Sequence, residues 1–335
     1  MRLLVDLGVV FFALCGGTAA GVGLAHHFAG GTLDRLAPRW RARLRFAGLT
    51  APPLLGLLGV CLAILPSALH LAGLGGDHCL NENEHNHAHL CLLHAPSGVS
   101  SLLAAVVAAF AALLLTRLTL ALLAGWQARR IFASVLATST LRQTGAAQFA
   151  FESDVPVCVT TGVFRPTIYI SSAAIDALGP ECVDAALAHE RGHVRRHDTR
   201  ARFVGSLLEA FHVPMLGREL AHHWHEDSEF LCDQYAAKLT DSTTVAEALV
   251  RFRRALHETH TGPALAEACL CASDSSLNAR VRVLLAADQS AAEETGSVAL
   301  ALGAILLGGG IALQARHLLH HSLESFVGFV AALTN

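Results

Sequence analysis

Apolar and polar positions divide the chain into four apolar runs and one long mixed region. The runs cover residues 3–24, 50–74, 99–123 and 298–313. A membrane-spanning helix needs about 20 predominantly apolar residues, so we expect four spans. The first run could instead be a cleaved signal peptide, but its length and its one early cation, Arg2, favour a retained span.

Charged residues between the runs predict how the chain is oriented in a membrane. The segment between the first two runs, which we expect to be a loop, contains Arg35, Arg39, Arg41, Arg43 and Arg45. Three more arginines lie near or after the end of the third run: Arg117, Arg129 and Arg130. The segment 75–97 has neither lysine nor arginine. By the positive-inside rule, the mixed region 127–296 is cytoplasmic, whereas 75–97 and the short amphipathic tail 317–333 lie outside.

Composition agrees with a membrane protein and disfavours one class of partner. Hydrophobic residues make up 53% of the chain and charged residues 15%, with a mean hydropathy of +0.47. A soluble domain is usually about 25% charged. The net charge of −3 gives no case for direct nucleic-acid binding. The nine cysteines, such as Cys15, Cys61, Cys158, Cys182 and Cys232, are scattered, and we expect most to be buried as small hydrophobic residues.

Residues 189–193 have the sequence H-E-R-G-H. They lie within the stretch 180–197, which we expect to be a helix, because alanine and leucine precede the motif and Pro180 suits the first helical position. His189 and His193, four residues apart, would aim ring nitrogens at one ion, and Glu190 would take a proton from a water beside it. A chance match on a polar helix face is the alternative. Gly192 weakens a helix, which indicates close approach of a neighbouring backbone or of substrate.

A third metal ligand is expected on a later helix. Residues 199–211 predict a helix that ends near Pro214, and 217–240 predict another. There Glu229 would complete a zinc site, and Asp233 would orient a ligand histidine through its second ring nitrogen. Glu226 is the rival ligand. Three histidines are further rivals that we expect to be solvated: His222, His223 and His225.

Residues 155–170 predict a β-hairpin around Thr160, Thr161 and Gly162. Pro156 and Pro166 indicate that both strands are edge strands. The hairpin is either purely structural or an edge beside the metal cleft, to which an extended substrate peptide can add as a strand.

Three sequence pieces resemble the BlaR/MecR-type membrane zinc metallopeptidases, the antirepressor family. They are V-P-V-C-V-T-T-G-V-F-R-P-T-I-Y-I-S, A-L-A-H-E-R-G-H-V-R-R-H-D and E-F-L-C-D-Q-Y-A, and L-N-A-R-V-R-V-L-L at 277–285 is also similar. The resemblance implies a signal-responsive protease that cleaves a cytoplasmic transcriptional repressor or itself. The best-known members carry a large penicillin-binding sensor after the last span. About twenty residues follow that span here, so we do not carry over β-lactam sensing.

Together these observations predict a mainly α fold. We expect a four-span membrane helix bundle with a cytoplasmic α+β zinc-metallopeptidase domain, similar to gluzincins, inserted between spans three and four. The division is 1–126 for the first three helices, 127–296 for the peptidase domain, and 297–335 for the fourth helix and outside tail.

The implied site comprises Zn²⁺ on His189, His193 and Glu229, with Glu190 as the catalytic base. Asp198 ends the first motif and is expected in the second shell, where it fixes the helix end or a nearby arginine. Arg195, Arg196 and His197 are expected to form a solvated face near lipid headgroups. An oxyanion stabiliser is expected, for which His225 and Arg218 are weak candidates.

The outside segment is rich in metal-binding side chains: His78, Cys79, His85, His87, His89, Cys91 and His94. Imidazole and thiolate suit Zn, Cu or Ni, so the segment is a candidate external metal loop. A Cys79–Cys91 disulfide is the alternative, and both can hold at once. Cys269 and Cys271 form a C-x-C that is a weak metal signal on its own.

Two other functions compete with a regulated peptidase. One is a quality-control membrane peptidase of the HtpX type, which shares H-E-x-x-H, E-x-x-x-D and a membrane anchor. The other is a metal-sensing membrane receptor with a non-proteolytic role. The partners expected are a protein substrate, the lipid bilayer and, as an open alternative, a second copy of the chain.

Overall fold

Three long helices form one end of the molecule. A computed structural model describes residues 2–74, 100–259, 274–286 and 316–334, and its fold is mainly helical. The long helices are α1 (Arg2–Leu33), α2 (Pro38–Leu71) and α3 (Ser101–Ala137), and all three are long and apolar enough to cross a membrane. The predicted fourth span, the external metal loop, Cys269 and Cys271 lie outside the described residues.

Helices α1 and α2 pack closely along the bundle. A Cβ atom added to Gly59 of α2 would lie 2.1 Å from Cδ1 of Leu14 on α1. Without a hydrophobic driving force between helices in lipid, small residues stabilise such pairs by letting the backbones approach. Helix α2 continues through three internal prolines, Pro52, Pro53 and Pro66, which membrane-spanning helices tolerate.

The arginine-rich segment is not a loop, which corrects the sequence prediction. Pro38 suits the first turn of a helix, so α2 begins there and carries Arg39, Arg41, Arg43 and Arg45 in its first turns. These arginines face opposite ways. The guanidinium groups of Arg39 and Arg43 stack over the ring of Trp40, whereas Arg41 and Arg45 turn inward to a carboxylate on another helix.

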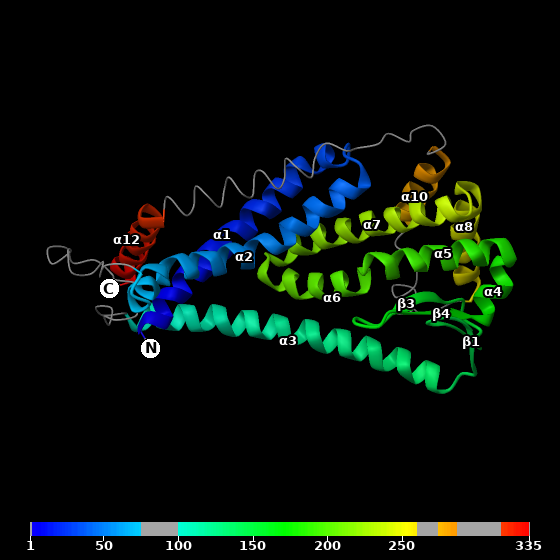
Figure 1. The fold of residues 1–335 in the computed structure, drawn as a ribbon, viewed down its shortest axis with the longest axis horizontal. Coiled ribbons are helices and arrows are strands. Elements are labelled where there is room, and N and C mark those ends of the chain that lie inside the picture. The colour runs from blue at the N-terminus through cyan, green and yellow to red at the C-terminus, as the bar shows by residue number, and fades with distance from the viewer. Residues whose placement is uncertain (1, 75–99, 260–273, 287–315, 335) are drawn as a thin grey trace.

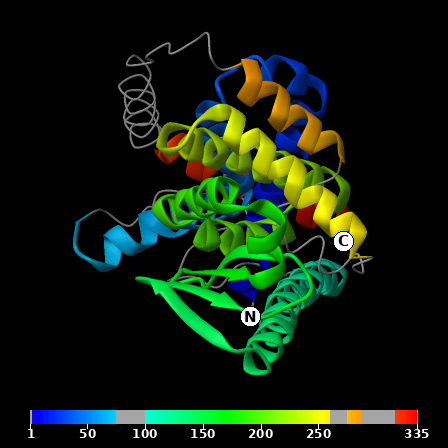
Figure 2. The ribbon, with the colours of Figure 1, turned by 90° about the vertical axis from the view of Figure 1, so that its right-hand side faces the viewer.

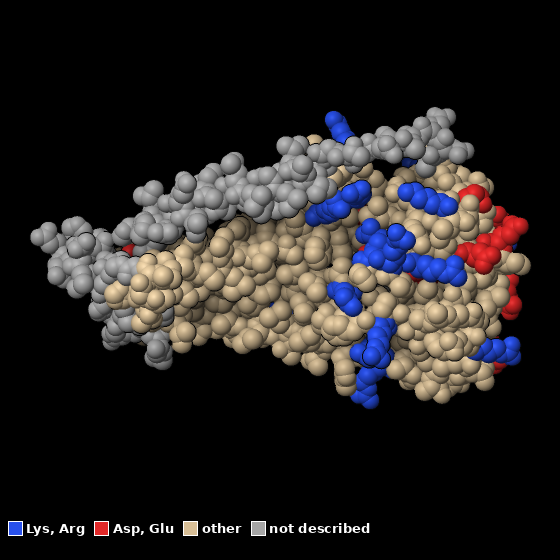
Figure 3. All heavy atoms as spheres, viewed as in Figure 1, with Lys and Arg blue, Asp and Glu red and all other residues tan. Residues whose placement is uncertain are grey.

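Basic side chains mark one boundary of the apolar part. Figure 3 shows a face whose Lys and Arg side chains begin about midway along the molecule, next to a long stretch that is almost entirely uncharged. On α3, Arg130 stacks over Trp126, as Arg43 stacks over Trp40 on α2. Arginine beside tryptophan is typical of the membrane–water interface.

The opposite end of the molecule contains a four-stranded sheet, with strands β1 (Leu141–Gly145), β2 (Gln148–Phe151), β3 (Cys158–Thr161) and β4 (Thr167–Ser171). Their order is β1-β2-β4-β3. β2 and β4 are parallel, and the other two pairs are antiparallel.

The predicted hairpin is present, but its turn and one strand differ from the prediction. β3 pairs with β4 with Val159 opposite Tyr169, and the turn falls after Thr161, where Gly162 has φ 98°. β3 is an edge strand, as expected. β4 is interior because 141–151 supplies two further strands, and Pro166 precedes β4, so its missing N–H interrupts no pairing.

Helices cover the sheet in successive layers. They are α4 (Ser172–Leu178), α5 (Pro180–Arg196), α6 (Asp198–Leu208), the 3₁₀ turn η1 (Glu209–Phe211), α7 (Pro214–Leu239), α8 (Ser242–Glu258) and α10 (Asp274–Ala286). Figures 1 and 2 both show the sheet on one side, then α5, then α8 and α10. The three helices predicted after the hairpin are confirmed as α5, as α6 with η1, and as α7.

Apolar contacts join the membrane helices to the sheet end. The last turns of α3 pack on the core of the sheet end through Phe132, whose ring lies 5.4 Å from that of Tyr169. At the other end of the bundle, the predicted amphipathic tail is helix α12 (Arg316–Thr334), whose buried Val327 packs with Val10 and Leu103 (Figure 1).

Candidate metal centre

Helix α5 presents the two motif histidines on one buried face. His189 and His193 are 2% and 5% exposed, and their ring centroids lie 4.9 Å apart. The helix has Glu181 in its first turn and arginines in its last, which complements the helix dipole. It ends at His197, whose φ of 58° is the left-handed conformation common after helices.

Gly192 lets α5 approach α7 closely. A Cβ atom at this position would lie 3.2 Å from both Cα and Sγ of Cys232 on α7, tighter than almost all real contacts. Of the two reasons expected from the sequence, close approach of a neighbouring backbone is the one the structure provides. This contact sets how near α7 comes to the motif histidines.

Glu229 of α7 completes a three-residue cluster with the histidines. Its Oε2 lies 3.3 Å from Nε2 of His189, and its Oε1 lies 3.4 Å from Nε2 of His193. Among the described residues, His189 Nε2 and Glu229 Oε2 are buried without a hydrogen-bond partner. Ligands of a tetrahedral zinc ion are about 3.3 Å apart, so the donor set and spacing fit such an ion.

Each histidine is oriented from behind by a carboxylate. Nδ1 of His189 lies 2.8 Å from Oδ1 of Asp233, and Nδ1 of His193 lies 2.9 Å from Oδ2 of Asp198. A proton on each Nδ1, donated to its carboxylate, leaves Nε2 free to coordinate an ion. Asp198 also accepts a bond from Arg196 Nε at 3.2 Å, so it both pairs with the arginine and orients the histidine.

Two arginines that sequence reasoning did not assign flank the cluster. Arg280 of α10 is 1% exposed, donates to both oxygens of Asp233 at 2.7 Å, and lies 3.3 Å from Oε2 of Glu229. Arg202 of α6 pairs with the other oxygen of Glu229. Arg280 lies inside the quoted L-N-A-R-V-R-V-L-L piece, so the resemblance contained a signal for it. The spacing of residues along the sequence contained no such signal, because Arg202 and Arg280 reach the cluster only through the tertiary structure.

These charges set the protonation of the cluster without a metal. Burial raises the pKa of the Glu229 carboxyl, but neighbouring His193, Arg280 and Arg202 outweigh burial and hold that pKa well below its usual range. For His189, burial lowers the pKa, but the carboxylates of Asp233 and Glu229 outweigh it and raise the pKa to about 9. Metal binding therefore has to displace a proton from His189.

Glu190 is held by the sheet. Its carboxylate is buried, and Oγ1 of Thr160 on edge strand β3 donates to Glu190 Oε2 at 2.5 Å. The hairpin prediction included Thr160 but assigned it no role. The contact places the edge strand directly beside the proposed catalytic base.

None of the rival ligands is a member of the three-residue cluster. Glu226 lies 3.5 Å from the exposed His222. The expected solvation of the three histidines is correct only for His222, because His223 and His225 are half-buried. Burial, helped by the charge of Arg202, lowers the pKa of His225 to about 4.

Other predicted residues are solvated or pack as expected. Arg195, Arg196 and His197 are exposed, and Arg218 has 80% of its side chain exposed beside Glu209. Of the described cysteines, Cys61 is exposed and the others are buried: Cys15, Cys158, Cys182 and Cys232.

A buried H-E-x-x-H helix with an acidic third residue, joined to helices that can cross a membrane, is typical of membrane metallopeptidases. The sequence model of the BlaR1 peptidase M56 family matches residues 75–284, more than half of the 335 residues. The chain belongs to this peptidase family. No curated protein matches the chain.

Proposed function

We propose that the chain is a membrane zinc endopeptidase that hydrolyses peptide bonds at the cluster of His189, His193 and Glu229. The observation that carries this proposal is the buried cluster itself, in which one ligand atom from each of the three side chains lies within 4.8 Å of the others, with both histidines on the helix that also carries Glu190. A zinc ion held by the three side chains would supply Lewis acidity to the scissile carbonyl and to the attacking water.

Glu190 would move the proton. Its carboxylate takes a proton from the attacking water and passes it to the leaving amine. The hydrogen bond from Thr160 keeps one carboxylate oxygen in place. Asp198 and Asp233 are occupied in accepting hydrogen bonds from the Nδ1–H groups of the histidines, so Glu190 is the carboxylate left to accept the water proton.

The substrate would bind as an added strand. β3 has a partner on one side only among the described strands, and its Thr160 contacts Glu190. An extended peptide that pairs with β3 through its main chain would bring a backbone carbonyl to the cluster. This binding mode requires an extended segment of polypeptide, so it suits a flexible or unfolded stretch of a protein substrate better than a folded protein surface or a small molecule.

We further propose that the peptidase domain faces the cytoplasm and that the substrate is a cytoplasmic transcriptional repressor or the chain itself. The arginines stacked on Trp40 and Trp126 support this orientation, because arginine is enriched on the cytoplasmic side of spans. The proposed division keeps 1–126 and 297–335 as membrane parts and 127–296 as the peptidase domain.

The test is co-expression of the chain with repressors encoded nearby, comparing wild type with Glu190→Gln. We expect wild type to cleave one repressor and Glu190→Gln to leave it intact while still binding zinc. Glu226→Gln serves as the matched control and should cleave normally. Equal cleavage by wild type and Glu190→Gln would overturn the proposal. Cleavage of unfolded membrane proteins alone would favour the quality-control alternative.

A further inference from the structure

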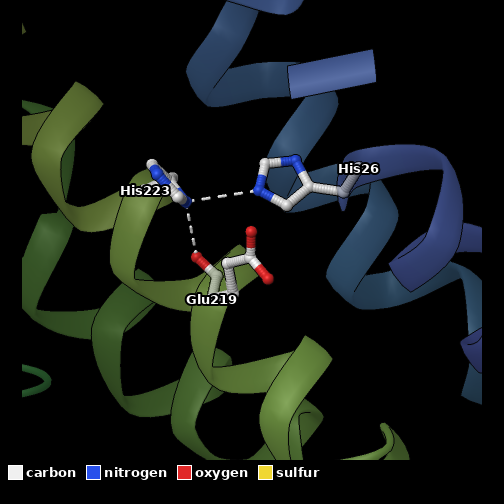
Figure 4. Close-up of side chains that lie close together, drawn as sticks. All are labelled: His26, Glu219 and His223. Atoms are coloured by element: carbon white, nitrogen blue, oxygen red, sulfur yellow. Dashed lines mark hydrogen bonds between the residues drawn. The ribbon is translucent and has the colours of Figure 1, made fainter. Parts of the chain in front are cut away.

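A second cluster of metal-binding side chains lies between α1 and α7. It comprises His26 of α1 with Glu219 and His223 of α7 (Figure 4). One ligand atom from each residue lies within 4.8 Å of the others. In Figure 4 both rings and the Glu219 carboxylate face the same space between the helices.

The two helices are built to bring these side chains together. Glu219 and His223 are four residues apart on α7, so they share a face. One turn earlier on each helix, Gly23 lies against Leu216, and a Cβ atom at Gly23 would be 2.7 Å from the Leu216 side chain. This close approach places His26, which is 6% exposed, directly over the Glu219–His223 face.

The distance between the two imidazoles matches that between ligands of one ion. Nε2 of His26 lies 3.3 Å from Nδ1 of His223, which equals the spacing of about 3.3 Å between nitrogens on a tetrahedral zinc ion. Nδ1 of His223 also lies 2.9 Å from the carbonyl oxygen of Glu219, so in the metal-free protein that nitrogen carries the proton. His26 Nε2 is then unprotonated and directs its lone pair into the cluster. On binding an ion, the neutral His223 ring keeps its proton by moving it to Nε2.

The Glu219 carboxylate keeps its charge available for a cation. Its ion-pair partner is His27, whose Nδ1 lies 3.5 Å from Oε1 and whose side chain is 56% exposed. The guanidinium of Arg45, which donates to the carbonyl oxygen of His223 at 3.3 Å, is already held by Asp34 at 2.8 Å and by Asp227 at 2.6 Å. Glu219 itself is 36% exposed, so an ion can reach the cluster from water.

We propose that His26, Glu219 and His223 bind one divalent transition-metal ion of the zinc class, separate from the peptidase centre. Two imidazoles and one carboxylate are a zinc-type donor set, and the fourth position is left for water. Glu219 is ten residues before Glu229 on α7, about 15 Å along the helix axis. The ion would cross-link the end of the apolar segment Leu3–Phe28 to the helix that carries the third ligand of the peptidase centre.

Zinc itself is the probe, and counting bound ions is the measurement. The full chain carrying Glu190→Gln, which prevents self-cleavage, is purified in detergent and equilibrated at a fixed free zinc concentration. Adding His26→Gln or His223→Gln should remove one zinc per chain. His222→Gln, on the neighbouring exposed histidine, is the matched control and should remove none. All these proteins share residues 75–97, so the comparison between them does not depend on whether that segment binds zinc.

A cysteine variant separates ligation from packing. His223→Cys replaces one ligand with another, so it should retain the ion lost in His223→Gln and show thiolate-to-cobalt absorption when Co²⁺ replaces zinc. Combining His223→Gln with His189→Gln should remove two ions, one from each site. Equal zinc content in His26→Gln, His223→Gln and the control would overturn the proposal, as would absence of the cobalt–thiolate band in His223→Cys.

Discussion

Each side chain of the peptidase cluster is held by another side chain. His189 and His193 rest on Asp233 and Asp198, and Glu190 is held by Thr160. The two histidines are therefore held in fixed orientations, as outer carboxylates hold the ligand histidines of zinc sites.

Asp198→Asn and Asp233→Asn should each weaken zinc binding by about 10- to 100-fold, because an amide orients the histidine less well and does not raise its basicity. Competition with a zinc chelator measures the effect. Asp184→Asn, on the exposed face of α5, is the control and should bind as wild type does. An unchanged affinity in Asp198→Asn would show that this carboxylate serves only the helix end and Arg196.

Thr160→Val should lower kcat by about tenfold, a part of the 10²- to 10⁴-fold that general acid–base catalysis contributes. Without the donated hydrogen bond the Glu190 carboxylate is held less firmly for proton transfer, so the loss should fall on kcat and leave KM close to that of wild type. Thr160→Ser keeps the hydroxyl and should restore kcat. A loss of kcat that Thr160→Ser does not restore would assign Thr160 to packing alone.

At the scale of elements, the contact between α5 and α7 assembles the centre. The two histidines come from α5, Glu229 and Asp233 from α7, and Gly192 sets the distance between the helices. Arg280 of α10 adds a third element behind the cluster.

Gly192→Ala should destabilise the protein despite the better helix propensity of alanine. The added methyl meets the backbone of Cys232, and overpacking of this kind costs about 1–3 kcal/mol, more than the ~1 kcal/mol gained from propensity. The midpoint temperature of thermal unfolding in detergent should fall, and so should the zinc content of the purified protein. Gly125→Ala, at a position with open space, is the control. A stabilised Gly192→Ala with full zinc content would contradict the close packing of α5 on α7.

At the scale of the whole molecule, the end that carries the sheet and the cluster is continuous with the long apolar helices. α3 runs from the apolar bundle into the core of the sheet end, and α7 pairs through Asp227 with Arg41 and Arg45 of α2. Movement of the bundle therefore has a direct mechanical route to the helix that carries Glu229.

The orientation of the chain can be tested with reporter fusions. A fusion after Thr240 should be cytoplasmic, because arginines gather at the same end of the bundle, and a fusion after His320 should be outside. The side of the membrane on which each fusion point lies is measured with two reporters, one active only in the cytoplasm and one active only outside. The same side for both fusions would mean that an even number of spans separates the two positions.

The local pattern of the sequence was enough for the helices that carry the site. Apolar runs predicted α1, α2 and α3, and Pro180 with the H-E-x-x-H spacing predicted α5, because propensity and periodicity act between neighbours in the chain. The helix predicted from Gly217 is α7, which begins three residues earlier, at Pro214. Tertiary structure decided what depends on distant residues. Thr160, Arg202 and Arg280 reach the cluster, β4 became interior, Arg41 and Arg45 turned inward, and His26 met His223, since each depends on contacts between segments far apart in sequence.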